Sequence, residues 1–257
     1  MPETFQKMLT VKTFFAIIMP MKNYTKNYLT AILILISVSY SYSQVSSYSE
    51  PFKYDRSSFF ILMGYLDGPS FQDYIDWANG FWGDELGAPE RLDDFSPGFC
   101  LTLGLRTRFS QYFALEVDFM TATKGTKTFY HTTNDGNIYN DLDLTVGAIT
   151  LSVPLIFQFT ENQRVVPFIA AGGTVFPLRL DHQLTTWGRR LTKTALAGNF
   201  SFGLESKIKS KIMATARLDR TFGKAKMPVS HPDYASEKFD IDLSTTQIQA
   251  GILYSFQ

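Results

Sequence analysis

The alternation of apolar and polar side chains near the C-terminus constrains this chain more than any other feature. Ile248, Ala250 and Ile252 fall on one face of this segment, and Gln247 and Gln249 fall on the other. Successive side chains of a β-strand point to opposite faces, so the segment has one apolar and one polar face. Such a strand can border lipid only within a closed barrel, because an open sheet edge leaves unpaired backbone groups in hydrocarbon.

The same alternation recurs upstream and predicts eight strands of about ten residues or more, which is the length that a tilted strand needs to cross a bilayer. We expect them at residues 57–66, 98–109, 111–122, 142–160, 164–180, 198–208, 211–222 and 245–256. Within 142–160 the apolar positions change phase, which predicts a bulge near Gly147. Within 164–180 the pattern predicts an outward orientation for Val166, Phe168, Ala170, Phe176 and Leu178.

The connections between these strands alternate in length. Short turns are expected at 110–111, 161–163 and 210–211, and long loops at 67–97, 123–141, 181–197 and 223–244. This asymmetry and the even strand count are typical of outer-membrane barrels. The predicted fold is therefore an all-β, eight-stranded antiparallel up-and-down transmembrane β-barrel with long outer loops and short periplasmic turns. A soluble sandwich or lipocalin-like barrel is the competing architecture, and the paired charges on the polar faces disfavour it.

The N-terminus has the layout of a secretory signal peptide over 1–43. A basic start at Met21-Lys22 precedes an apolar core and small residues, which predicts cleavage after Ser43, with 1–20 as an upstream extension. Residues 44–56 are then a linker and 57–257 the barrel. The chain has 24 basic and 24 acidic residues, of which four lysines and one glutamate lie in 1–43, so the remainder has a net charge of −3. This charge gives no reason to expect nucleic-acid binding.

Charged residues on the polar faces form the first candidate site. Positive and negative charges are equal in number, and residues of opposite charge lie beside each other on neighbouring strands. We therefore expect a structural network of ion pairs that fills the lumen. A narrow ion or proton path is the functional alternative. The predicted lumen residues are Arg106, Arg108, Glu116, Asp118, Glu205, Lys207, Arg217 and Asp219.

The long loops supply the remaining candidates. Residues 67–97 carry a net charge of −7, and the segment from Ser70 to Asp73 resembles a helix start that would cap the barrel mouth. Its carboxylates lack the spacing of a calcium loop, so no metal is expected. The three histidines are expected in separate loops, and no nucleophile motif accompanies them, so catalysis is disfavoured although acyl transfer stays open. They are His131, His182 and His231, with Asp181 and Ser230 beside the last two. With Cys100 as the single cysteine, neither an intramolecular disulfide nor a thiolate metal site is expected, and no cofactor is predicted.

Aromatic residues near the predicted strand ends match the girdles of outer-membrane barrels. Together with the leader end Ser41-Tyr-Ser-Gln44 and the terminal Tyr254-Ser-Phe256, the pattern over 57–257 resembles the small OmpA-like and PorT-like barrels common in Bacteroidetes. The resemblance implies an outer-membrane location, contact with outer-membrane lipid and lipopolysaccharide, and the barrel-assembly machinery as a partner in biogenesis. PorT-like membership would also imply association with type IX secretion components. No peptidoglycan-binding domain follows the last strand, which puts an OmpA-type anchoring role in doubt.

Three functions follow from these expectations. The first is a non-catalytic barrel acting in structure, adhesion or accessory secretion through its outer loops. The second is a narrow OmpW-like transport barrel for small or hydrophobic solutes. The third is a lipid-modifying enzyme similar to the palmitoyltransferase PagP.

Overall fold

The computed structural model describes residues 57–84, 91–132, 136–159, 163–184, 187–229 and 237–256, and the predicted leader and linker lie outside them. Eight strands in this part of the chain form a closed antiparallel barrel in the order β1-β10-β7-β6-β5-β4-β3-β2. Their bounds are β1 Ser57–Asp67, β2 Gly98–Arg108, β3 Ala114–Thr132, β4 Gly136–Ile156, β5 Val165–Leu184, β6 Trp187–Lys209, β7 Ile212–Phe222 and β10 Thr246–Phe256. The barrel closes where Ile61 of β1 pairs with Ile252 of β10 on one side and Leu103 of β2 on the other.

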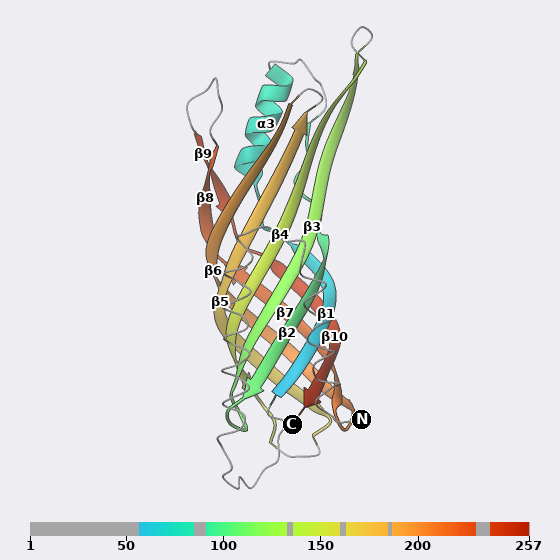
Figure 1. Ribbon diagram of the computed structural model, residues 1–257, viewed down its shortest axis with the longest axis vertical. Coiled ribbons are helices and arrows are strands. Elements are labelled where there is room, and N and C mark those ends of the chain that lie inside the picture. Colours follow the sequence, from blue (N-terminus) through green and yellow to red (C-terminus); the bar gives the residue numbers. More distant parts are fainter. Residues whose placement is uncertain are drawn as a thin grey trace, which may run out of the picture. The chain divides into compact units, whose positions relative to one another are not determined.

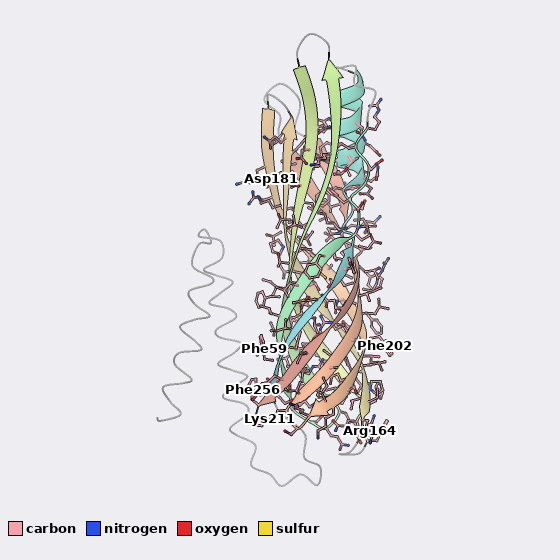
Figure 2. All side chains as sticks on the ribbon, turned by 90° about the vertical axis from the view of Figure 1, so that its right-hand side faces the viewer. Phe59, Arg164, Asp181, Phe202, Lys211 and Phe256 are labelled. Carbon is pink, nitrogen blue, oxygen red and sulfur yellow. The ribbon has the colours of Figure 1, made fainter. Side chains whose placement is uncertain are left out.

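The apolar faces of the strands look outward. Met63 is 54 % exposed, Phe202 46 % and Ile252 54 %, whereas the inward residues between them are buried. In Figure 2, Phe59 and Phe202 lie at the outer surface of the wall, and Arg164 and Lys211 lie at the short-turn end. A band of exposed apolar side chains around a closed barrel is the surface that lipid requires. The predicted fold class is therefore confirmed. No helix among the described residues is long and apolar enough to cross a membrane.

Four strands are longer than the alternation indicated. β3, β4, β5 and β6 contain 19, 21, 20 and 23 residues, whereas each of the other four barrel strands contains 11. The predicted loops 123–141 and 181–197 are therefore wrong in large part, because both segments continue as hairpins. Figure 1 shows β3 to β6 rising past the remaining strands. The outward residues of these extensions are polar, because they face water beyond the lipid. The pattern of outward apolar side chains that identifies a membrane strand is therefore lost there.

The predicted loop 223–244 also contains a hairpin, whereas the helix start predicted within 67–97 is confirmed. β8 (Lys224–Val229) pairs with β9 (Glu237–Asp242), and α3 covers Gln72–Asp84. Figure 1 places α3 and this hairpin at the same end of the barrel as the tall strands. We call the extended parts of β3–β6, together with α3 and β8–β9, the head.

The composition of the interior changes along its length. Toward the short turns it combines charges with a small apolar cluster of Ala114, Ile156, Val166 and Phe168, and toward the head it carries Leu, Phe, Val and Ala. This change accounts for the phase shift in β4, and the predicted bulge near Gly147 is wrong: the register with β5 is the same at Val146↔Leu178 as at Ile149↔Val175. The predicted outward orientation in β5 is also wrong, because the inner face of this strand contributes to both apolar clusters. Each of these side chains is at most 3 % exposed and faces inward: Val166, Phe168, Ala170, Phe176 and Leu178.

The apolar part of the interior joins the barrel to the head in one cluster. The inner faces of the tall strands pack against buried residues of α3, the segment after it and β9. Among the cluster members are Phe71, Tyr74, Ile75, Leu92, Phe95, Leu142, Leu144, Val146, Phe176, Leu178, Leu180, Phe239 and Ile241. Burial of this apolar area holds the helix against the wall.

Candidate functional site: the filled barrel interior

Two arginines organise the polar half of the interior. Arg106 of β2 donates from Nε to Glu116 Oε2 at 2.7 Å and from Nη1 to Glu205 Oε1 on the far side of the barrel. All three side chains are at most 4 % exposed. Charge-assisted hydrogen bonds of this kind compensate part of the cost of burying ions.

The second arginine, Arg217 of β7, joins the same set. Its Nη1 donates to Glu116 Oε1 at 2.6 Å, its Nε to Asp219 Oδ2 at 2.7 Å and its Nη2 to Asp118 Oδ2 at 3.0 Å. Glu116 thus bridges the two guanidinium groups. We call these six residues the ion network: Arg106, Glu116, Asp118, Glu205, Arg217 and Asp219.

Two of the eight predicted lumen residues do not belong to the ion network. Arg108 is half-buried near the short turns, where its Nη1 donates to Gln158 Oε1 at 2.7 Å. Lys207 is exposed. By the alternation of side chains, both belong to the lumen face of their strands, but they lie near the strand ends, where the barrel opens to solvent.

A phenylalanine packs against the wall beside each arginine. The Arg217 guanidinium carbon lies 5.6 Å from the ring centroid of Phe60, a cation–π distance. That ring rests on Gly104, which pairs with Phe60 across β1 and β2. A Cβ atom at Gly104 would lie 2.1 Å from Phe60 Cζ, so only glycine leaves room for the ring.

The arrangement repeats on the opposite wall. Arg106 lies 4.7 Å above the ring of Phe168, and Phe168 rests on Gly203, its partner across β5 and β6. A Cβ at Gly203 would lie 2.3 Å from Phe168 Cζ. Glycine, ring and guanidinium together fill the lumen from both sides.

The outer surface of the head carries charges that mark the limit of the lipid. Asp181 accepts from Arg179 Nε and from Arg190 Nε, both at 2.6 Å, and both arginines are about half exposed. Figure 2 shows Asp181 on the head, well away from the short turns. Exposed ion pairs are costly against hydrocarbon, so this part of β5 and β6 lies outside the membrane.

A hydrogen-bonded chain fixes the helix to the wall inside the head. The Tyr74 hydroxyl of α3 lies 2.8 Å from His182 Nδ1, and His182 Nε2 lies 2.8 Å from Asn140 Oδ1 of β4. Because the amide oxygen can only accept, Nε2 carries the proton and the tyrosine donates to Nδ1. Burial, with the Arg189 cation nearby, lowers the pKa of His182 to about 4, so the imidazole is neutral. Burial also raises the pKa of the Tyr74 hydroxyl.

Of the three histidines, His182 is the one whose side chain the structure describes. His182 is buried and Asp181 faces outward, because neighbours on a strand point to opposite faces. His131 belongs to β3, where it pairs with Asn137. Ser230 and His231 lie outside the described residues. His182 is engaged by the helix and by Asn140, which is a positioning arrangement.

Sequence reasoning missed the partners that complete these sites. Tyr74 and Asn140 gave no signal, since their contact joins residues 108 and 42 positions from His182. The glycine–phenylalanine pairs did leave a signal: a glycine at an inward position opposite an inward phenylalanine on the next strand. Recognising it requires the correct register, which the structure supplies.

The fold has solved counterparts. Over 79 % of this chain and 98 % of that chain, the structure is similar to the outer membrane protein OprG from Pseudomonas aeruginosa, with 15 % identity and a TM-score of 0.54. Neisserial surface protein A shares 12 % identity over 78 % and 96 %, with a TM-score of 0.47. Ail of Yersinia pestis shares 14 % over 77 % and 99 %, with a TM-score of 0.40.

No model of a known protein family matches the sequence, and no curated protein matches it. At these identities the likeness to OprG extends to the fold alone. The chain therefore has the eight-stranded fold of outer-membrane β-barrels.

Proposed function

We propose that this protein is a non-catalytic outer-membrane barrel whose lumen is filled and whose head binds partners outside the cell, in adhesion or accessory secretion. The observation that carries the proposal is the continuous filling of the interior. The ion network occupies the part within the lipid-facing band, and the apolar cluster with α3 occupies the part toward the head. A filled interior blocks passage, and the four tall strands hold a structured surface away from the membrane.

The head is built as a folded unit, which supports a role in recognition. Long loops are ordinarily irregular, but here the β3–β4 and β5–β6 extensions pack against helix α3 and the β8–β9 hairpin. Tyr74 and Trp77 of α3 both contact Phe239 of β9, at centroid distances of 5.3 and 5.6 Å. Such a scaffold presents its outer residues in fixed positions, which lowers the entropy cost of binding a partner.

The remaining expectations complete the proposal. Export by the segment 1–43 would bring the chain to the barrel-assembly machinery, and the apolar band would then contact outer-membrane lipid and lipopolysaccharide. Type IX secretion components are candidate partners of the head. Transport of small or hydrophobic solutes is the competing function, and it requires a path through the interior.

Conductance in planar bilayers tests the filled interior. We expect the refolded wild type to insert without stable unitary currents, and a variant with Glu116→Ala and Arg217→Ala to conduct if it remains folded. Uptake of a fluorescent hydrophobic solute into vesicles covers the uncharged cargo that conductance misses. Currents or uptake with the wild type would replace the proposed function by transport.

A second experiment tests the head. Intact cells expressing the protein are cross-linked, with and without prior removal of surface-exposed segments by protease, and the barrel is purified. A partner that is recovered from untreated cells and lost after protease treatment supports recognition through the head. Recovery that is unchanged by the treatment would assign the partner to the membrane or periplasmic side.

A further inference from the structure

The charges of the ion network do not balance. Two guanidinium groups, Arg106 and Arg217, face four carboxyl groups, and the six side chains are at most 7 % exposed. The eight charges recognised in the sequence sum to zero, but the two cations at the barrel end, Arg108 and Lys207, stand outside this set. Two excess negative charges in an interior surrounded by lipid are strongly unfavourable.

Of the four carboxyl groups in the ion network, Asp118 accepts the weakest hydrogen bonding. Glu116 accepts from both arginines, and Asp219 accepts from Arg217 Nε and from the Ser201 hydroxyl. Asp118 accepts one hydrogen bond from Arg217, whose length of 3.0 Å makes it the longest contact in the network. Three carboxyl groups thus share the Arg217 guanidinium, and like charges that share one site do not all ionise.

A second observation indicates that a hydrogen-bond donor is missing from this part of the interior. Gln249 is 2 % exposed and pairs with Arg217 across β7 and β10. Its Nε2 donates to Thr102 Oγ1 at 2.6 Å, whereas its Oε1 has no hydrogen-bond partner among the described residues. Thr102 is the next inward residue from Gly104 on β2, and Gly104 pairs with Asp118. A buried acceptor without a donor among the described residues therefore lies beside Arg217, the residue that Asp118 contacts.

We propose that the ion network binds one proton, carried by the Asp118 carboxyl. A protonated carboxyl group can donate a hydrogen bond, whereas an ionised one cannot. One proton therefore halves the excess charge and adds a hydrogen-bond donor to the ion network. Whether Asp118 binds this proton depends on the whole network, because the charges of all the other members surround the carboxyl group. The charged and titratable groups near it are Cys100 and Arg106 on β2, Glu116 on β3, Glu205 on β6, and Arg217 and Asp219 on β7, with Arg108 and Lys207 toward the short turns.

Infrared spectroscopy of the refolded wild type at neutral pH tests the proposal, in a detergent that contains no carbonyl group. Solvent-exposed carboxyl groups are ionised at this pH. We expect a carbonyl stretch from one protonated carboxyl, which is lost in Asp118→Asn. Absence of the band in the wild type would overturn the proposal, and so would its persistence in Asp118→Asn.

Equilibrium unfolding gives an independent readout. An amide closely imitates a neutral carboxyl group, so Asp118→Asn should change the folding equilibrium constant by no more than about threefold, whereas Asp219→Asn should lower it by at least about 30-fold. The reverse order would contradict a proton on Asp118. If Asp118→Asn does not fold, ¹³C labelling of the aspartate side chains in the wild type decides: a shift of the band supports Asp118, and an unshifted band places the proton on a glutamate and overturns the proposal.

Discussion

Replacing Gly104 by alanine should destabilise the barrel by overpacking the ring that supports Arg217. The new Cβ would lie 2.1 Å from Phe60 Cζ and 2.6 Å from Cε2. Carbon atoms pack best at about 3.5–4.0 Å, so the ring must move by about 1.5 Å. Its other face meets the guanidinium of Arg217, which carboxyl groups hold in place. The ring therefore cannot retreat without disturbing the ion network.

The expected cost follows from this geometry. Forcing extra methyl groups into a packed interior costs about 1–3 kcal/mol, which is about 5- to 150-fold in the folding equilibrium constant. Gly198→Ala is the matched control, because its Cβ would lie 3.9 Å from the nearest atom, Phe222 O. That change should stay within about 0.5 kcal/mol. Phe60→Leu should restore part of the loss in Gly104→Ala, with a coupling free energy of at least about 1 kcal/mol.

Urea titration of the barrel refolded in micelles measures these differences, with circular dichroism of the strands as the signal and the midpoint and slope fitted together. The wild type, the three single variants and the double variant need the same slope for a direct comparison. The packing argument is refuted if Gly104→Ala is no less stable than Gly198→Ala. It is also refuted if adding Phe60→Leu lowers the stability of Gly104→Ala by as much as it lowers that of the wild type.

Three further predictions concern the charges. Arg217→Gln should cost about 3–5 kcal/mol in urea titration, since it leaves three buried carboxyl groups without the guanidinium that they share, whereas Arg108→Gln at the barrel end should cost less than about 1 kcal/mol. The folded pKa of His182 is below its ordinary 6.5, so its contribution to docking of α3 is complete above pH 6.5 and is lost as the pH falls toward 4, by about 3 kcal/mol. Fluorescence of the three tryptophans, which belong to α3 and the start of β6, should report this loosening, and His182→Asn should remove the pH dependence. Arg190→Gln should cost less than about 1 kcal/mol by thermal unfolding and become neutral at high salt, because its ion pair is exposed; a larger, salt-insensitive loss would contradict this view.

The candidate site was predictable where side-chain alternation alone decides orientation. Glu116, Asp118 and Arg217 were placed inside because their neighbours on each strand are apolar, and any closed register keeps that orientation. Which carboxyl group meets which arginine was not predictable. Arg106 contacts Glu205, 99 positions away, and Arg217 contacts Glu116, 101 positions away, across the lumen. Such contacts depend on the diameter and register of the barrel.

The helix of the head was predicted, but its strand extensions escaped prediction for a different reason. Alternation detects a strand only when its two faces meet different surroundings, as they do between lipid and a polar lumen. In the extensions of β4 and β5 the inner face is apolar and the outer face meets water, which reverses the pattern seen in the wall. Leu142 and Phe176 therefore resembled an outward face or a bulge, although they pack in the centre of the apolar cluster.

The sequence by itself determined the barrel, its strand number and which face of each wall strand is apolar and outward, with the exception of β5, because lipid imposes a two-residue period on spanning strands. Tertiary structure decided how far the strands continue, which contacts hold the helix in place and which charges pair. Those features depend on contacts between segments far apart in the chain, such as Tyr74 with His182, and local periodicity carries no information about them.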